Sequence, residues 1–334
     1  MLKIIDSKQV TLVDNPDAWL KSFEGPTVIE IAGRDQSRWR IVSTLIHGNE
    51  PSGFIAAHRY LLEKRVPATN VAFIISSVRA ARYEQLYQHR YMPGEFDLNR
   101  RFGYLEVHDS VTELARQITE YIREKCPSAV VDLHNTSGRS PAFAVSISEH
   151  PKVQHVASLF VDQVIITQLN VGALMEQNFN CPVVTIECGG SKDKQSHENA
   201  YSGLCLFAET DQLDSMAPKP LAINKHPIRV TVKPGISLGY GEHLNTDLDM
   251  TLKNELEEFN FTGVNRGTCV GWLNRSISDC MEAISDKGIN VIDDLFELDN
   301  HALKAKQDLK CFMATRRADI ALSDCLFYTL PMPD

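Results

Sequence analysis

The chain has 334 residues, of which 43% are hydrophobic and 23% charged, a composition typical of a folded globular protein and not of a disordered one. With 43 acidic against 34 basic residues its formal net charge is −9, which argues against nucleic acid or an anionic membrane as the main partner, because both attract basic surfaces. At this length we expect two domains of unequal size.

Short apolar runs alternate with helical patterns over the first two thirds of the chain. Runs rich in β-branched residues predict strands at residues 27–31, 39–46, 71–76, 129–133 and 181–186. Apolar residues at helical spacing predict helices at residues 51–64, 111–125 and 151–163. Near-continuous apolar strands separated by helices indicate an α/β domain whose mostly parallel, mixed sheet is flanked by helices.

The composition of the sequence changes after about Asp211. Prolines become frequent there, and short runs predict strands at residues 228–232, 248–252, 268–272 and 309–313. The acidity is concentrated in the same part, because residues 211–334 contain 13 basic and 19 acidic residues. We therefore expect an α/β domain over residues 1–212 and a smaller β-rich C-terminal domain over residues 213–334.

The cysteines and the lack of long apolar segments bear on the compartment. The eight cysteines are scattered without a C-x-x-C pair, which indicates reduced, packed thiols and not a disulfide framework. No segment approaches the roughly 20 apolar residues that cross a bilayer, and residues 1–16 lack the pattern of a signal peptide. We expect a cytoplasmic protein.

A histidine and a glutamate stand three residues apart between a predicted strand and a predicted helix. Across such a turn His47 and Glu50 can both reach one cation, and an imidazole nitrogen and a carboxylate oxygen are suitable zinc ligands. Gly48 and Gly53 permit a tight backbone path around them. Alone, this pattern is more often a helix-capping glutamate beside a surface histidine.

Two further predicted strands end in residues of the same chemistry. His134 follows one buried strand and Glu187 follows another. Ligands of open α/β sheets bind outside the carboxyl ends of the strands, so we expect His47, Glu50, His134 and Glu187 at one edge. Two histidines and one glutamate leave a fourth zinc position open for water, and the remaining glutamate can act as general base.

The segment from Arg79 to Arg101 contains five arginines, no lysine and only three acidic residues. Arginine is typical of sites where a planar guanidinium binds a carboxylate through two hydrogen bonds. A solvated basic loop would have the same composition, and the segment alone does not decide between the two interpretations.

Together these residues resemble the succinylglutamate desuccinylase/aspartoacylase family, a branch of the zinc carboxypeptidase-like superfamily. The resemblance rests on five motifs in the family's order. They are H-G-N-E-P-S-G at 47–53, R-Y at 90–91, D-L-N-R at 97–100, D-L-H-N at 132–135 and I-E-C-G at 186–189.

The resemblance assigns a role to each residue of the predicted sheet edge. It implies that His47, Glu50 and His134 bind one zinc ion per chain. It also implies that Glu187 is the general base and then the proton donor to the leaving amine. Asp132, two residues before His134, would orient a ligand histidine or serve as a hydrogen-bonded strand end.

The resemblance also implies a set of substrate-binding residues. Arg90 would polarise the scissile carbonyl, and Asn99 and Arg100 would hold the substrate's α-carboxylate. Tyr328 would be the tyrosine that the C-terminal domain contributes to the site in this family.

One feature departs from the family's N-acyl-amino-acid hydrolases, which use a further arginine to bind a dicarboxylate substrate. No arginine occurs here between Arg139 and Arg229, and Glu176 and Gln177 occupy the corresponding stretch. We therefore expect a substrate other than N-acetylaspartate or succinylglutamate.

These motifs predict a zinc-dependent hydrolase that uses metal-activated water to cleave an amide bond of a small N-acylated amino acid or related carboxylate. One alternative is a metallocarboxypeptidase that acts on short peptides, and another is a catalytically silent metal-binding sensor. The expected partner is a small carboxylate, and neither nucleic acid nor a membrane. The sequence leaves open the acyl group, the amine and whether the protein is a homo-oligomer, while the His/His/Glu set favours zinc among divalent ions.

Overall fold

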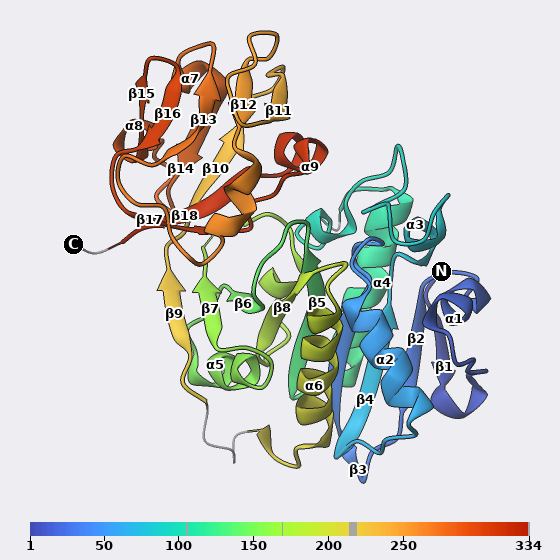
Figure 1. Cartoon of the computed structure of the whole chain (residues 1–334). Coiled ribbons are helices and arrows are strands. Elements are labelled where there is room, and N and C mark those ends of the chain that lie inside the picture. Colours follow the sequence, from blue (N-terminus) through green and yellow to red (C-terminus); the bar gives the residue numbers. More distant parts are fainter. Residues whose placement is uncertain (105, 169, 214–218, 333–334) are drawn as a thin grey trace. The chain divides into compact units, whose positions relative to one another are not determined.

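The computed structural model describes residues 1–104, 106–168, 170–213 and 219–332. The chain divides into two compact units, the first made of Met1–Asn135 and Ala142–Ile223 and the second of Thr136–Pro141 and Asn224–Asp334 (Figure 1). The domain boundary expected between residues 212 and 213 falls beside residues 214–218, which lie outside the described residues.

The first unit is built on a nine-stranded mixed sheet of strand order β1-β2-β4-β3-β5-β8-β6-β7-β9. The strands are β1 (Lys3–Asp6), β2 (Thr27–Ile31), β3 (Asp35–Thr44), β4 (Thr69–Ile75), β5 (Ala129–Thr136), β6 (Phe143–Ser146), β7 (Gln163–Ile166), β8 (Val183–Gly190) and β9 (Ala222–Lys225). β3 pairs in parallel with β4 and β5, whereas β2 is antiparallel to β4 and β6 is antiparallel to β8. The predicted α/β fold with a mixed sheet is confirmed.

Helices cover both faces of this sheet (Figure 1). They are α1 (Pro16–Ser22), α2 (Ser52–Leu62), α3 (Val78–Arg82), α4 (Ser110–Lys125), α5 (Pro151–Ser158) and α6 (Lys194–Glu209), with 3-10 helices η1 (Ser7–Gln9), η2 (Leu98–Arg100) and η3 (Leu174–Glu176). Val42 of β3 belongs to the core under α2 and α6, while its neighbour Ile41 belongs to the core under α4. Successive residues of a strand face opposite sides, so a strand covered on both faces is apolar throughout.

The second unit contains two further sheets, of strand order β14-β10-β18-β17 and β11-β12-β13-β16-β15. Their strands are β10 (Ile228–Val232), β11 (Leu238–Tyr240), β12 (Met250–Leu252), β13 (Cys269–Leu273), β14 (Met281–Ile284), β15 (Phe296–Asp299), β16 (Ala302–Ala305), β17 (Leu309–Phe312) and β18 (Phe327–Pro331). The short helices are α7 (Ile277–Cys280), α8 (Ile292–Leu295), α9 (Ala318–Ser323) and the 3-10 helix η5 (Asn254–Phe259). A separate core that includes Val230, Leu273 and Phe327 holds this β-rich unit together.

The structure contains no disulfide among its described cysteines. All eight cysteines are free, and Cys188, Cys280, Cys311 and Cys325 are buried. Among the described residues, no helix combines the length and the apolar character needed to cross a membrane.

Candidate active site

His47 and Glu50 lie in the turn between β3 and α2, and close backbone packing fixes the path of this turn. The N–H of Gly48 donates to the carbonyl oxygen of Arg90 at 2.8 Å. A Cβ atom on Gly48 would lie 2.5 Å from the backbone nitrogen of Ala81 and 2.7 Å from the carbonyl oxygen of His89. Only glycine fits there, so the H-G-N-E motif is tied to the segment that carries Arg90.

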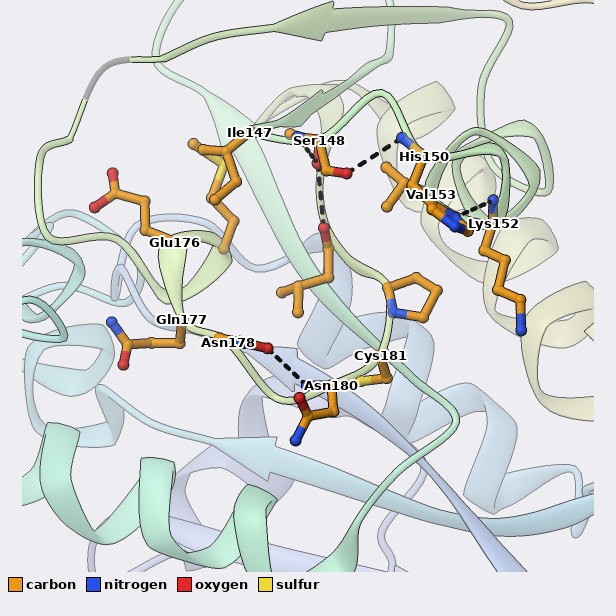
Figure 2. Close-up of a pocket in the computed structure, with 14 residues that line it drawn as sticks. Ile147, Ser148, His150, Lys152, Val153, Glu176, Gln177, Asn178, Asn180 and Cys181 are labelled. Carbon is orange, nitrogen blue, oxygen red and sulfur yellow. Dashed lines mark hydrogen bonds between the residues drawn. The ribbon is translucent and has the colours of Figure 1, made fainter.

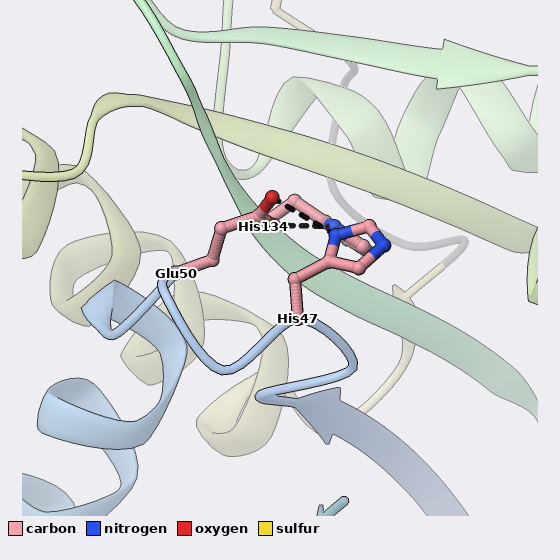
Figure 3. Close-up of side chains that lie close together, drawn as sticks. All are labelled: His47, Glu50 and His134. Atoms are coloured by element: carbon pink, nitrogen blue, oxygen red, sulfur yellow. Dashed lines mark hydrogen bonds and ion pairs between the residues drawn. The ribbon is translucent and has the colours of Figure 1, made fainter. Parts of the chain in front are cut away.

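The structure brings His47, Glu50 and His134 together as a buried group, here called the His–Glu–His cluster (Figure 3). One potential ligand atom from each residue lies within 4.8 Å of the others. The Oε1 atom of Glu50 is 2.9 Å from Nδ1 of His47, and its Oε2 atom is 2.7 Å from Nδ1 of His134. Both imidazoles therefore turn the same ring nitrogen toward one carboxylate.

The opposite nitrogen of each imidazole faces a second carboxylate. Nε2 of His134 is 2.6 Å from Oδ2 of Asp132, and Nε2 of His47 is 3.0 Å from Oδ1 of Asp97. A carboxylate on the far nitrogen is the usual partner of a metal-binding histidine, because it fixes the tautomer and the ring orientation. The donor set and these partners fit a zinc ion held through the Nδ1 atoms.

Sequence reasoning anticipated Asp132 but missed Asp97. Asp97 is the first residue of the D-L-N-R motif, and besides facing His47 it accepts a hydrogen bond at 2.9 Å from Nε of Arg90. The sequence held one clue to its role, because Asp97 begins the D-L-N-R motif, but we interpreted that motif only through Asn99 and Arg100.

Attraction between carboxylates and imidazoles governs the ionisation of the cluster. Although burial opposes a charged imidazole, Asp132 and Glu50 hold the pKa of His134 well above its usual value. Burial likewise opposes ionisation of Glu50 and Asp97, yet both pKa values lie below the usual range. The pKa of Glu50 is lowered by His47 and His134, and that of Asp97 by His47 and Arg90. A divalent cation would therefore find the carboxylates already charged, whereas His134 would have to release its proton in order to bind the ion.

Glu187 lies on β8 and is 7% exposed. Its Oε2 atom is buried and has no hydrogen-bond partner among the described residues. Burial raises the pKa of this carboxyl to about 7, with Glu50 adding to the shift while His134 and Arg90 oppose it. A carboxyl that titrates near neutral pH can both accept and return a proton.

The predicted substrate-binding residues of the first unit lie beside this cluster. Arg90 donates to Asp97, and its NH1 group is 3.4 Å from Oε1 of Glu50. Asn99, in η2, accepts a hydrogen bond at 3.0 Å from the N–H of Leu174, whereas its amide nitrogen has no partner among the described residues. The side chain of Arg100 donates to the carbonyl oxygen of Asn99 at 3.1 Å.

Three of the five arginines between residues 79 and 101 have other partners. Arg79 pairs with Glu95 at 3.0 Å, and Arg101 pairs with Asp109 at 3.3 Å. Arg82 donates to a backbone carbonyl at the end of α1. Arg90 is the arginine of this segment that is seen to reach the cluster, through Glu50.

Glu176, which the sequence predicts to stand near the position of the family's further arginine, is engaged within its own loop. Both carboxylate oxygens of Glu176 accept backbone N–H groups, from Val171 and Gly172, each at 2.8 Å. Glu176 and Gln177 also line a cavity of about 460 Å³ beside the start of β8 (Figure 2). The other lining residues are Ser146, Ile147, Ser148, His150, Lys152, Val153, Met175, Asn178, Asn180, Cys181, Pro182 and Val183. None of the cluster residues lines this cavity.

Tyr328 lies in the second unit, on β18. In the sheet register it stands opposite Arg229 of β10 and Phe312 of β17. Its contribution to the active site stays a prediction.

Comparisons with known proteins agree on the architecture. Residues 19–181 match a family model described as "Carboxypeptidase controlling helical cell shape catalytic". No curated protein sequence matches the chain significantly.

Solved structures resemble the chain over most of its length. A succinylglutamate desuccinylase/aspartoacylase from Rhodobacter sphaeroides aligns with a TM-score of 0.57 at 13% identity, covering 92% of this chain and 89% of that one. For a succinylglutamate desuccinylase from Vibrio parahaemolyticus the TM-score is 0.56 at 17% identity, over 90% and 85% of the two chains. For murine aminoacylase 3 the TM-score is 0.55 at 14% identity, over 89% and 96%. At these identities the likeness concerns the fold.

Proposed function

The chain has the zinc carboxypeptidase-like fold of the succinylglutamate desuccinylase/aspartoacylase proteins, as its motifs predicted, and on this premise we propose a zinc-dependent amide hydrolase. Its substrate class would be a small N-acylated amino acid or a related carboxylate. The observation that carries the proposal is the buried His–Glu–His cluster, whose two imidazoles are each backed by a carboxylate. The free thiols agree with a cytoplasmic location.

In this proposal His47, Glu50 and His134 hold one zinc ion per chain. Zinc in such a three-ligand site supplies a bound water with a pKa near 7 and polarises the substrate carbonyl. Glu187 takes the proton from the attacking water and later gives it to the departing amine. Its buried, unpartnered Oε2 atom suits both transfers.

Arg90, Asn99 and Arg100 would bind the substrate. The guanidinium of Arg90 stabilises the developing oxyanion, a task for which a fixed, partly buried donor is effective. The amide nitrogen of Asn99 and the guanidinium of Arg100 hold the substrate carboxylate. Asp97 keeps Arg90 and His47 in one hydrogen-bonded arrangement, so the oxyanion donor and a metal ligand are oriented together.

A metallocarboxypeptidase is the second candidate, and the match of residues 19–181 to a carboxypeptidase family model favours it. The two candidates share the metal site and the carboxylate-binding pair, and they differ in what precedes the scissile amide. A deacylase takes a simple acyl group, whereas a carboxypeptidase takes a peptide.

A hydrolysis screen with metal analysis in parallel tests the proposal. Zinc-loaded protein should release amine from members of an N-acyl amino acid panel, and Glu187→Gln should lower kcat by at least about a thousandfold while one zinc per chain is retained. Release of C-terminal residues from a peptide ladder, without N-acyl amino acid hydrolysis, would favour the carboxypeptidase. Stoichiometric zinc with no turnover of either panel would leave the sensor alternative.

A further inference from the structure

The side chain of Asn135, next in sequence to His134, is buried and has every hydrogen-bonding group engaged. Its Oδ1 atom accepts from the backbone N–H of Ser52 at 3.0 Å. Its Nδ2 atom donates to Oγ of Ser52 at 2.8 Å and to the carbonyl oxygen of Gly189 at 2.9 Å. With a donor facing the oxygen and two acceptors facing the nitrogen, only one orientation of the amide satisfies all three bonds.

These bonds join the three segments that carry the candidate catalytic residues. Ser52 begins α2, two residues after Glu50, and Gly189 lies on β8, two residues after Glu187. Asn135 itself lies on β5, and its backbone N–H donates to Oε2 of Glu50 at 3.2 Å. One side chain therefore links the turn of the H-G-N-E motif, the strand of the second histidine and the strand of the general base.

His197 of α6 extends the same network. Its Nδ1 atom is 2.8 Å from Oγ of Ser52. Because that oxygen already accepts from Asn135, its own hydrogen can be donated to Nδ1 of His197. Burial lowers the pKa of His197, which favours the neutral imidazole that such an acceptor requires.

We propose that Asn135, Ser52 and His197 form a positioning unit that presets the spacing of the His–Glu–His cluster and Glu187 before metal or substrate binds. The inference rests on the proposed function, since preset spacing matters only if the cluster holds a metal. These residues act through their neighbours and do not contact the reacting atoms. A buried asparagine that served folding alone would change stability without changing metal affinity, so the two interpretations make different predictions.

The test compares Asn135→Ala with Asn70→Ala. Asn70 of β4 is also buried, accepts from the N–H of Gly33 at 3.0 Å and donates to the carbonyl oxygen of Gln36 at 2.8 Å. Within the described part of the chain, no hydrogen bond joins it to the cluster. Zinc affinity would be measured by competition with a chromogenic chelator, alongside kcat, KM and Tm. We expect Asn135→Ala to weaken zinc binding by about 10- to 100-fold and to lower kcat more than it raises KM. Asn70→Ala should lower Tm only.

Ser52→Ala keeps the experiment decisive if Asn135→Ala fails to fold. It removes the two hydrogen bonds that Oγ makes, with Asn135 and with His197, and should weaken zinc binding by about fivefold. If wild-type protein bound no zinc, the proposed function would be wrong and the inference with it. If wild-type protein bound one zinc and turned over substrate while both variants kept its zinc affinity and kcat, only the positioning unit would be wrong.

Discussion

Glu187 is a buried carboxyl whose surroundings decide where it titrates. In the metal-free protein its pKa is raised to about 7, whereas an unfolded glutamate has the ordinary value of 4.5. Between these two values the folded state keeps a proton that the unfolded state has lost, so stability must fall as the pH rises through this window. The loss amounts to at most about 3 kcal/mol by pH 8.

Glu187→Gln replaces the protonated carboxyl by a neutral group of the same shape and removes this pH dependence. Relative to wild type, the metal-free variant should therefore gain stability from pH 5 to pH 8, by up to about 3 kcal/mol. Urea unfolding of both proteins at the two pH values measures the difference, in which titrations common to both proteins cancel. A difference that stayed constant with pH would contradict the raised pKa.

The single side chain of Asp97 connects three parts of the proposed site. Its two oxygens face Nε2 of His47 and Nε of Arg90, and Oδ1 also accepts the backbone N–H of Asn99. A proposed metal ligand, the proposed oxyanion donor and the turn proposed to bind the substrate carboxylate therefore share one carboxylate. A shift of any one of these groups must move the others.

At the scale of elements, α6 depends on a buried arginine from another element. Arg40 of β3 is 1% exposed, and its guanidinium donates to carbonyl oxygens at the end of α6 and just beyond it. The acceptors are Phe207, Ala208 at 3.4 Å, Thr210 at 2.6 Å and Asp211 at 3.2 Å. Burial lowers the pKa of Arg40 to about 10, so it stays charged at neutral pH, where a cation also suits the negative end of the helix dipole.

Arg40→Met should therefore leave several carbonyl groups buried without a donor. We expect a loss of about 3 kcal/mol in the free energy of unfolding, seen by urea denaturation. Arg38→Met is the matched control, because Arg38 is exposed and its ion pair with Asp35 should contribute less than about 1 kcal/mol. Equal losses in the two variants would show that Arg40 does not hold the end of α6.

A helix or strand can be predicted from the sequence when its buried residues form a continuous or periodic apolar pattern. Strands covered on both faces are apolar throughout, so the central strands β2, β3, β4, β5 and β8 were recognisable. We missed α6, although Ala200, Leu204 and Phe207 are buried on one face, because Gly203 and several polar residues interrupt the pattern. Short strands such as β6 and β7 contain too few residues for a periodic signal.

The site was predictable where it follows from sheet topology. His134 and Glu187 lie in the last halves of neighbouring strands, so their convergence follows from the sheet alone. The contacts of Asp97 with His47 and of Asn135 with Ser52 and Gly189 join segments far apart in sequence through side chains. No periodic pattern encodes such contacts, so they became visible only in the folded chain.

At the scale of the whole molecule, metal binding should affect the stability of the two units differently. Each unit has its own hydrophobic core, and all three residues of the His–Glu–His cluster belong to the first unit. A ligand that binds only the folded state stabilises it by mass action, about 2.7 kcal/mol when its free concentration is a hundred times its Kd. Zinc should therefore stabilise the first unit directly.

Removing zinc with a chelator should accordingly lower the Tm of the protein, and adding zinc back should restore it. Hydrogen exchange should place the zinc-dependent protection in the turn between β3 and α2, in β5 and in the segment around Asp97, because these carry the ligands and their carboxylate partners. Glu50→Gln, which removes the charge between the two imidazoles, should lose most of the response. A Tm unchanged by zinc, or equal zinc-dependent shifts in wild type and Glu50→Gln, would rule out the cluster as the metal site.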